Sequence, residues 1–261
     1  MSEIFVVTSG KGGVGKTTVS AFLGAKLAAR GKRTIVCDLD FGLNNLDIVM
    51  GTEKIVRFDL SDALEGRCRA SQSLVPCAVK NLYMISSCHM AGGGTVTSAN
   101  IKSLFDGLRS NFDYILLDCP AGIDVGFHRA VQAADGAIVV VTPSLSSVRD
   151  ADKTLSVLRS YNLAEVNIVV NMVRGDLAVE GLALSVADVE DILKCKVIGV
   201  IPYDDEIMTA ENCVLPDSLV GGKCFKNLAA AVVGGKVRLY DCEKQYCGIG
   251  GSIRRGLKKI V

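Results

Sequence analysis

Residues 10–18 read Gly10-Lys11-Gly12-Gly13-Val14-Gly15-Lys16-Thr17-Thr18, between the apolar run 4–8 and an amphipathic stretch at 17–30. The pattern GxxxxGK[ST] between a strand and a helix is typical of a phosphate-binding loop. Its glycines let backbone N–H groups surround phosphate oxygens, and the helix N-terminus adds positive potential. We expect Lys16 to reach the β- and γ-phosphates and the Thr17 hydroxyl to ligate Mg²⁺. Residues 10–18 are therefore predicted to bind ATP.

The rest of the chain alternates short apolar runs rich in Val and Ile with amphipathic stretches. We expect strands at residues 4–8, 33–38, 82–86, 114–118, 137–142, 167–171 and 197–201. We expect helices near residues 17–30, 61–65, 101–110, 127–134, 148–160, 185–193 and 225–233. This alternation predicts an α/β protein with a three-layer P-loop NTPase fold, a mostly parallel twisted sheet with helices on both faces. Ligands of such sheets bind beyond the carboxyl ends of the strands.

Carboxylates lie at two of these strand ends. Asp38 ends one strand, with Asp40 just beyond it, and Asp118 ends the apolar run Ile115-Leu116-Leu117. An aspartate that an apolar strand delivers beside a P-loop usually faces Mg²⁺, directly or through water. We therefore expect Thr17, Asp38 and Asp118 to form a metal site, with ATP and Mg²⁺ as cofactors. Turn or cap chemistry is the alternative for any one of these aspartates, and it explains three together poorly.

Composition narrows the class of protein. At 261 residues with 49% hydrophobic side chains, the chain fits one large α/β domain. Its net charge of +1 provides no general attraction to nucleic acid. We expect a cytoplasmic protein, because a strand begins at once without a secretory signal and no apolar run approaches the ~18 residues that span a bilayer. The ten cysteines form no CxxC pair and are expected to be reduced and packed as small hydrophobic residues.

The C-terminus differs from the rest of the chain. Residues 249–261 carry four basic side chains and no acidic one, which leaves 25 basic against 28 acidic side chains in the body. On a helical wheel at ~100° per residue, the apolar residues of this stretch occupy an arc of about 120°. Arg254, Arg255, Lys258 and Lys259 occupy the opposite arc.

This arrangement predicts an amphipathic helix that lies in the plane of a membrane interface, attracted by anionic lipid. The expected membrane-binding residues are Ile249, Ile253, Arg254, Leu257, Lys258 and Ile260. The chain is thus divided into a P-loop ATPase domain, residues 1–235, and a flexible tail, residues 236–261, with the helix at about 249–261. So short a segment is marginal as a helix in water, and we expect it to form on a bilayer. A helix docked on the protein's own body is the alternative.

Lys11 is an unusual residue in a phosphate-binding loop, because Lys16 already serves the phosphates. With Lys11, the loop resembles KGGxGK[ST], the deviant Walker A signature of the MinD/ParA class of ATPases. The resemblance implies a dimer that encloses two ATP molecules, in which Lys11 stabilises phosphoryl charge on the partner's nucleotide. It implies ATP hydrolysis with Lys11, Lys16 and Asp40 as catalytic residues, Asp40 orienting the attacking water. A solvated surface lysine is the alternative for Lys11.

Three further segments resemble parts of the nucleotide site in this class. Residues 120–122, after Asp118, resemble switch II, a loop able to sense the γ-phosphate. Residues 171–174 resemble the adenine-side segment of the class, and residues 201–204 would close over the base. The resemblance therefore implies Asn171, Arg174, Pro202 and Asp204 as ATP-binding residues. An ordinary turn former is the alternative for Asn171.

Within the class, residues 41–51, 146–153, 184–189 and 197–202 resemble the MinD family, and the resemblance runs over nearly the whole chain. It implies a homodimer that forms with ATP, binds the anionic inner face of the cell membrane reversibly and places the division septum. It implies a MinC-like division inhibitor as a recruited partner and a topological regulator, MinE-like or linked to DivIVA. It implies no specific nucleic-acid partner.

Other functions share parts of this sequence pattern. A flagellar-number regulator of the same class also carries an amphipathic C-terminus, but residues 146–153 favour the MinD family. A ParA-like DNA-partition ATPase would place basic residues over a folded surface, whereas here the surplus of positive charge lies in the tail. An electron-transfer ATPase similar to the nitrogenase iron protein needs cysteines at an iron–sulfur cluster, and Cys119 is the only suggestive thiol. A P-loop kinase would need an acceptor site and a lid, which the sequence does not indicate.

Overall fold

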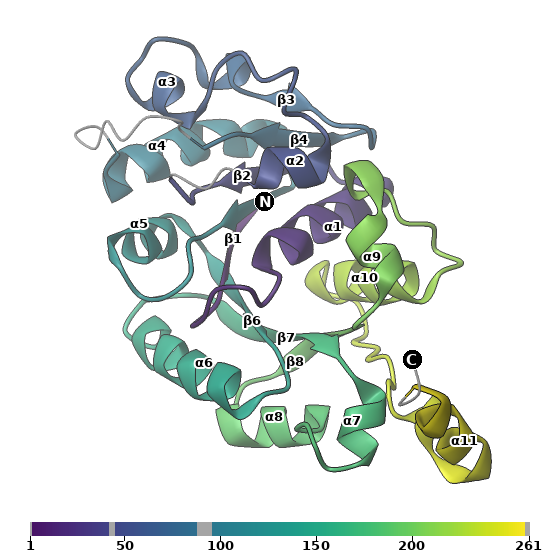
Figure 1. The fold of residues 1–261 in the computed structure, drawn as a ribbon. Helices are drawn as coiled ribbons and strands as arrows, with labels where there is room; N and C mark the ends of the chain where they lie inside the picture. The colour runs from purple at the N-terminus through teal and green to yellow at the C-terminus, as the bar shows by residue number, and fades with distance from the viewer. Residues whose placement is uncertain (1, 42–44, 88–95, 259–261) are drawn as a thin grey trace.

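A single eight-stranded sheet forms the centre of the molecule, in a computed structural model that describes residues 2–41, 45–87 and 96–258. Its strand order is β3-β4-β2-β5-β1-β6-β7-β8, and neighbours are parallel except for the antiparallel edge pair of β3 and β4 (Figure 1). The strands are β1 (Glu3–Thr8), β2 (Thr34–Asp38), β3 (Val75–Pro76), β4 (Leu82–Ile85), β5 (Tyr114–Asp118), β6 (Gly136–Val141), β7 (Glu165–Val173) and β8 (Val197–Pro202). The parallel sheet is the one that the alternating sequence pattern predicts.

The connections between parallel strands are mostly helical. The α-helices are α1 (Lys16–Ala29), α2 (Leu46–Met50), α3 (Leu60–Leu64), α4 (Ser98–Leu108), α5 (Val125–Ala133), α6 (Leu145–Leu158), α7 (Gly175–Val179), α8 (Val186–Leu193), α9 (Asp205–Thr209), α10 (Val220–Val232) and α11 (Gly248–Lys258). Short 3₁₀ turns are η1 (Ala70–Gln72), η2 (Arg109–Asn111), η3 (Glu211–Cys213) and η4 (Lys244–Tyr246). All seven predicted strands and all seven predicted helices are present, most of them with shifted ends. The prediction missed β3, α2, α7 and α9, because elements of two to five residues are too short for a periodic pattern.

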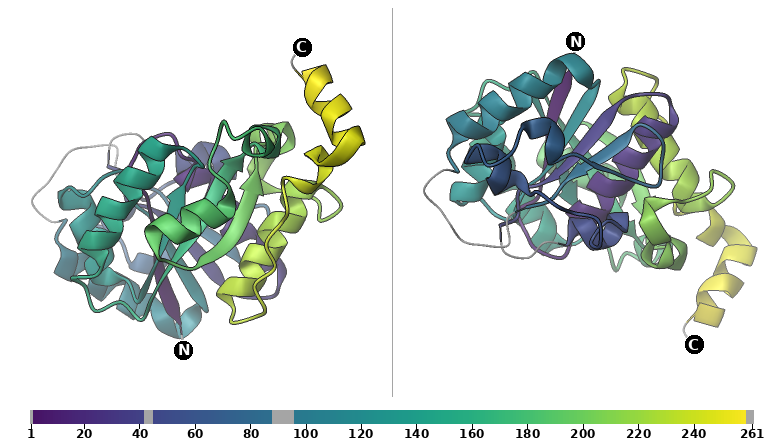
Figure 2. Two further views of the ribbon diagram at one scale, coloured as in Figure 1. Left: turned by 90° about the horizontal axis from the view of Figure 1, so that it is seen from below. Right: turned by 90° about the horizontal axis from the view of Figure 1, so that it is seen from above.

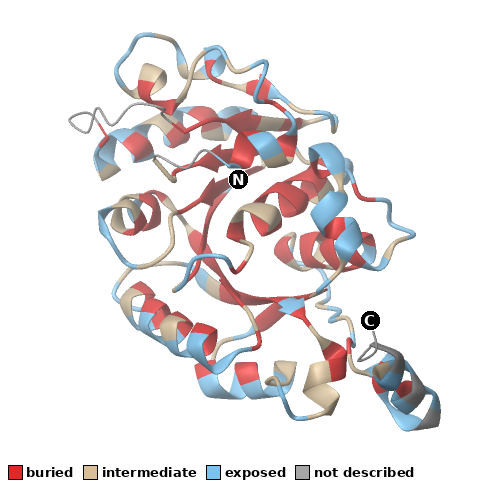
Figure 3. Cartoon of the chain, viewed as in Figure 1, coloured by how far each residue is buried: buried red, intermediate tan, exposed pale blue. Residues whose placement is uncertain are grey.

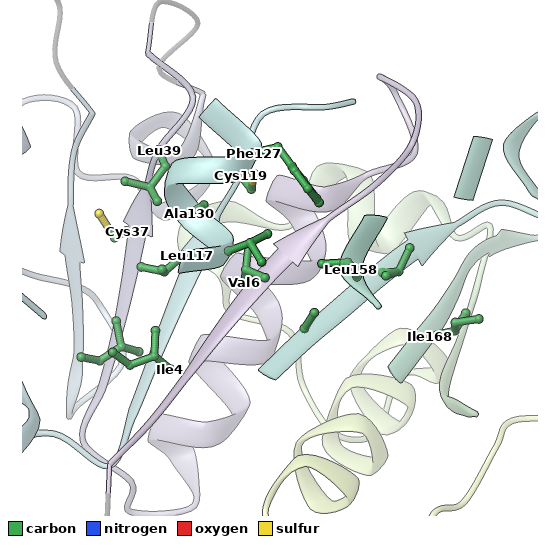
Figure 4. Packing of buried hydrophobic residues seen from close by; sticks show 14 of the residues in the cluster. Ile4, Val6, Cys37, Leu39, Leu117, Cys119, Phe127, Ala130, Leu158 and Ile168 are labelled. Atoms are coloured by element: carbon green, nitrogen blue, oxygen red, sulfur yellow. The ribbon is translucent and has the colours of Figure 1, made fainter. Parts of the chain in front are cut away.

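Alternate residues of each central strand face opposite sides of the sheet, which creates two hydrophobic cores. In β1, Ile4 and Val6 face a core that α4, α5, α6 and α8 cover, part of which Figure 4 shows around Phe127. Phe5 and Val7 face the other core, which α1 and α10 cover. There the rings of Phe22 and Phe225 stack with their centroids 5.0 Å apart. The fold is therefore a three-layer α/β sandwich, as predicted, with the buried strands at its centre (Figure 3).

The C-terminal residues cross the outside of this sandwich. Residues 236–247, which the sequence assigns to a flexible tail, contact the body, since Cys242 is 5% exposed and Tyr246 8%. These two apolar side chains explain why the segment packs. After it, α11 extends outward beside α7 (Figures 1 and 2). In the described part of the chain, no helix has the length and apolar character required to span a bilayer.

Candidate nucleotide-binding site

The phosphate-binding loop connects β1 to α1, as the sequence predicts. Gly13 and Gly15 have φ of 77° and 84°, a left-handed conformation that glycine adopts without steric cost. Lys16 is the first residue of α1 and is buried. The loop is also held from outside, because the Asn171 side-chain amide donates a hydrogen bond of 2.9 Å to the Val14 carbonyl. Residues of the protein itself therefore help to hold the backbone shape of the loop.

Two buried carboxylates lie side by side behind this loop. The parallel pairing of β2 with β5 places Asp38 opposite Asp118, and each is 2% exposed. Asp118 Oδ1 accepts a hydrogen bond of 3.0 Å from the Ser20 hydroxyl, and Asp38 Oδ1 accepts one of 2.8 Å from the Asp40 backbone N–H. Asp40 itself is half-buried at the edge of the pair. The three predicted aspartates are thus brought together.

Burial controls the charge of this pair. Loss of water and then the neighbouring Asp118 raise the pKa of Asp38 to about 7. Burial raises the pKa of Asp118 to about 6, although hydrogen bonds from Thr17 and Ser20 and the charge of Lys16 lower it. Two adjacent acids that resist ionisation are a set of ligands that a divalent cation stabilises in the charged form. Thr17, Asp38 and Asp118 therefore fit Mg²⁺, which commonly uses one or two carboxylates and completes its shell with phosphate oxygens.

A small cavity lies on the other side of α1, where the base is expected. It has a volume of about 60 Å³ and is lined by Thr18, Asn171, Met172, Pro202, Tyr203, Asp204, Ile207 and Met208. Four predicted ATP-binding residues thus lie around one cavity: Thr18, Asn171, Pro202 and Asp204. Asp204 also caps α9, since its carboxylate accepts a hydrogen bond of 3.0 Å from the Glu206 N–H.

Two predicted residues make contacts within their own chain instead. The guanidinium of Arg174 pairs with both carboxylate oxygens of Asp176, at 2.9 and 2.6 Å, and lines a separate apolar pocket of about 560 Å³ between α6 and α7. Lys11 is exposed, and its ammonium lies 3.4 Å from the Ser146 hydroxyl at the start of α6. The contact of Lys11 with a partner's nucleotide stays a prediction.

The predicted membrane residues belong to α11. Arg254 is exposed, and the backbones of Ile249, Ile253, Leu257 and Lys258 are helical. The side chains of those four residues, and the whole of Ile260, lie outside the described residues. Their role at a membrane therefore stays a prediction.

Sequence reasoning missed three residues of the site. Ser20, which bonds Asp118, lies three residues after Thr17 on α1, and this spacing could have revealed it. Met172 has φ of 56° and, like Met208, lines the cavity beside Asn171. No sequence signal marks these two methionines, because the left-handed turn at Met172 arises where the register between β7 and β8 shifts.

Comparison with known proteins identifies the family. The family described as ParA, NUBPL iron-transfer P-loop NTPase, matches residues 1–217. The septum site-determining protein MinD of Bacillus subtilis is 39% identical, over 97% of this chain and 97% of its own length. In the solved MinC:MinD cell division complex of Aquifex aeolicus, a chain is 34% identical, with a TM-score of 0.84 over 92% of this chain and 99% of that one.

A second solved structure, MinD of Pyrococcus horikoshii in complex with Mg-ADP, is 26% identical, with a TM-score of 0.79 over 89% of this chain and 96% of that one. The similarity covers the P-loop, both strands that carry the buried aspartates, and almost all the rest of the sequence. The chain belongs to the MinD family of septum site-determining proteins and is a P-loop ATPase.

Proposed function

We propose that this ATPase encloses ATP between two copies of itself, that the ATP-bound dimer binds the anionic inner face of the cell membrane, and that hydrolysis releases it. On the membrane it recruits a MinC-like division inhibitor and so places the division septum. The observation that carries this proposal is the presence, in one chain, of a buried Asp38–Asp118 pair behind a P-loop and a C-terminal basic helix. The first supplies a switch and the second supplies an anchor.

The hydrolytic roles follow from position. Lys16 lies buried at the start of α1, where its charge is close enough to lower the pKa of Asp118, and it holds the phosphates. Mg²⁺ neutralises charge on the phosphate oxygens when it is bound, and Thr17, Asp38 and Asp118 would hold it. Asp40 lies two residues beyond the end of β2, half-buried at the edge of the pair, and it orients the attacking water.

The dimer follows from Lys11. This lysine is exposed, and its hydrogen bond to Ser146 is long, so a partner's phosphate can replace that contact. A cation that arrives from the second subunit stabilises the transferring phosphoryl group only when both subunits are in place. ATP binding and dimerisation thereby become one event.

The membrane role follows from two weak anchors. Each basic residue near an anionic surface contributes roughly 1 kcal/mol, so a single tail binds weakly. Two tails on one dimer gain avidity without any new contact. Dimerisation by ATP would therefore switch membrane attachment on.

The partner proposal rests on α6 and on the relatives. Residues 146–153 of α6, in which Ser146, Arg149, Asp152 and Lys153 are exposed, resemble the stretch of MinD near which the division inhibitor and the topological regulator dock. The Aquifex relative was solved as a MinC:MinD complex. We therefore place a MinC-like inhibitor, and a MinE-like or DivIVA-linked regulator, at this helix.

Sedimentation with anionic liposomes tests the proposal directly. The full chain should sediment with liposomes in ATP and Mg²⁺ and stay in the supernatant with ADP. Equal sedimentation in both nucleotides would contradict the ATP switch. Binding to duplex DNA but not to liposomes would instead favour the ParA-like alternative, and loss of flagellar control in cells with normal septa would favour the flagellar-number regulator.

An electron-transfer role finds less support. Cys119, the thiol beside the site, is 1% exposed, and burial, followed by the nearby Asp118, raises its pKa. A thiol so buried and so resistant to ionisation is a poor cluster ligand at a subunit interface.

A further inference from the structure

Residues 240–247 form a strap across α7. Within the strap, the side chains of Cys242 and Tyr246 are buried, and the strap backbone lies directly on Gly175, the first residue of α7. A Cβ atom at Gly175 would lie 1.9 Å from the Cys242 carbonyl oxygen, so only glycine allows this approach. The strap therefore fixes the start of α11 close to α7.

Arg255 then returns from α11 to the far end of α7. Its Nε lies 3.5 Å from Oε1 of Glu180, the residue directly after α7, and both side chains are 20% exposed. The same guanidinium donates hydrogen bonds to the Tyr246 carbonyl and, at 3.1 Å, to the Ser252 hydroxyl. Thus the strap contacts the first residue of α7, and Arg255 contacts the residue that follows its last.

This contact uses a residue of the basic arc that is expected to face anionic lipid. Arg255 lies on the basic arc of the tail helix, whose neighbour Arg254 is exposed. A guanidinium binds a phosphate through paired N–H groups, and the same groups cannot lie against Glu180 at that time. The Glu180 carboxylate would moreover repel an anionic surface brought close to it. Docking on α7 and binding of lipid headgroups by Arg255 therefore exclude each other.

The docking site is also close to the nucleotide site along the chain. Asn171, which holds the P-loop through Val14, lies four residues before α7 begins. Arg174, between them, pairs with Asp176 inside α7. If a bound base displaces the carboxyl end of β7, the short helix α7 connects that displacement to Glu180.

We propose that the Arg255–Glu180 pair is an autoinhibitory latch that holds the tail helix on α7, and that anionic phospholipid headgroups open it by replacing Glu180 as the partner of Arg255. This inference rests on the membrane function proposed above and adds a regulator to it. Because the pair is partly exposed, its loss should shift the docking equilibrium about two- to fivefold.

The test compares Glu180→Gln with Asp191→Asn. Both variants remove one negative charge, but the Asp191 side chain is 84% exposed on α8 and pairs, at 3.8 Å, with Lys194, a surface residue that is itself 75% exposed. With ADP, Glu180→Gln should bind vesicles of equal parts phosphatidylglycerol and phosphatidylethanolamine about two- to fivefold more tightly than Asp191→Asn does. On phosphatidylcholine vesicles the two variants should be alike, since that headgroup carries no net charge to compete for Arg255.

Hydrogen exchange without lipid provides the second measurement. Amides of residues 248–258 should exchange about two- to fivefold faster in Glu180→Gln than in wild type or Asp191→Asn. Unchanged exchange, or equal vesicle binding by the two variants, overturns the latch. Wild-type sedimentation with ATP is measured in the same series, so failure of the membrane function itself is seen separately as a lack of vesicle binding by every variant.

Discussion

The nucleotide end of the molecule and its C-terminal end are held in place by opposite means. Asp38, Asp118 and the P-loop lie on adjacent central strands and are buried under hydrogen bonds between residues distant in sequence. By contrast, α11 touches the body through a strap, one buried glycine and the partly exposed ion pair of Arg255. The first region is built to keep its shape while its ligand changes. The second has few contacts with the body, and the proposed latch requires that they can be broken at small cost.

The largest expected effect is a loss of membrane binding by the tail, with nucleotide binding unchanged. Leu257→Glu places a charge in the apolar arc and removes a burial worth roughly 1.5–3 kcal/mol in each of two tails, or roughly 10²–10⁴ in binding by a dimer. The variant should bind ATP normally and stay in the supernatant with anionic liposomes. Gln245→Glu is the control, because it adds the same charge in η4, outside α11. If Leu257→Glu sediments as wild type does, α11 is not the anchor.

A smaller but still large effect is expected on ATP hydrolysis, with the tail unchanged. Asp40→Ala removes the carboxylate that orients water but leaves the P-loop intact, so ATP should bind and the hydrolysis rate should fall roughly 10²-fold. The trapped ATP state should then sediment more completely with liposomes than wild type. Lys16→Ala, measured beside it, should lose ATP affinity instead. Wild-type turnover by Asp40→Ala would refute the role given to Asp40.

The two regions were also predictable to different degrees. The P-loop, Asp38 and Asp118 could be predicted because each is a short motif at a strand end, and the parallel sheet brings such ends together. The left-handed turn at Met172 could not, since it depends on a register shift between β7 and β8. Nor could the contact between Arg255 and Glu180, because the helical wheel shows which face of a helix is basic and not what lies beside it.

Arg174 has a partner that the sequence analysis did not anticipate. The resemblance of residues 171–174 to the adenine-side segment implies ATP binding by Arg174, which stays a prediction, and its guanidinium pairs with Asp176 at the start of α7. These two side chains are only two residues apart in the sequence. The partner of Arg174 lies in α7, the short helix that follows it in the chain. Because the sequence pattern did not reveal α7, it could not predict this pair.

The smallest expected effect is on the free energy of unfolding, and it tests whether the nucleotide site, unlike the C-terminal tail, is destabilised by its own charge. Because burial raises the pKa of Asp38 to about 7 from 3.8, folding favours its protonated form. A raised pKa in an acid means that stability is highest below the unfolded pKa and falls as the pH rises toward the folded one. In EDTA, the free energy of unfolding should therefore decrease between about pH 4 and pH 7.

Asp38→Asn removes this cost, because the amide is neutral at every pH and nearly the same size as the acid. Measured by urea unfolding in EDTA, the stability advantage of the variant over wild type should grow by about 2–3 kcal/mol from pH 5 to pH 8. Unfolded Asp38 is already ionised at pH 5, whereas folded Asp38 loses its proton only near pH 7. Asp217 provides a control of opposite sign, because hydrogen bonds from Lys226 and Lys26 lower its pKa. Asp217→Asn should lose stability equally at pH 8 and pH 5, since its carboxylate is ionised at both. If the gain in stability of Asp38→Asn does not depend on pH, ionisation of Asp38 does not destabilise the folded site. The contrast between a nucleotide site destabilised by its own charge and a tail without such a cost would then be wrong.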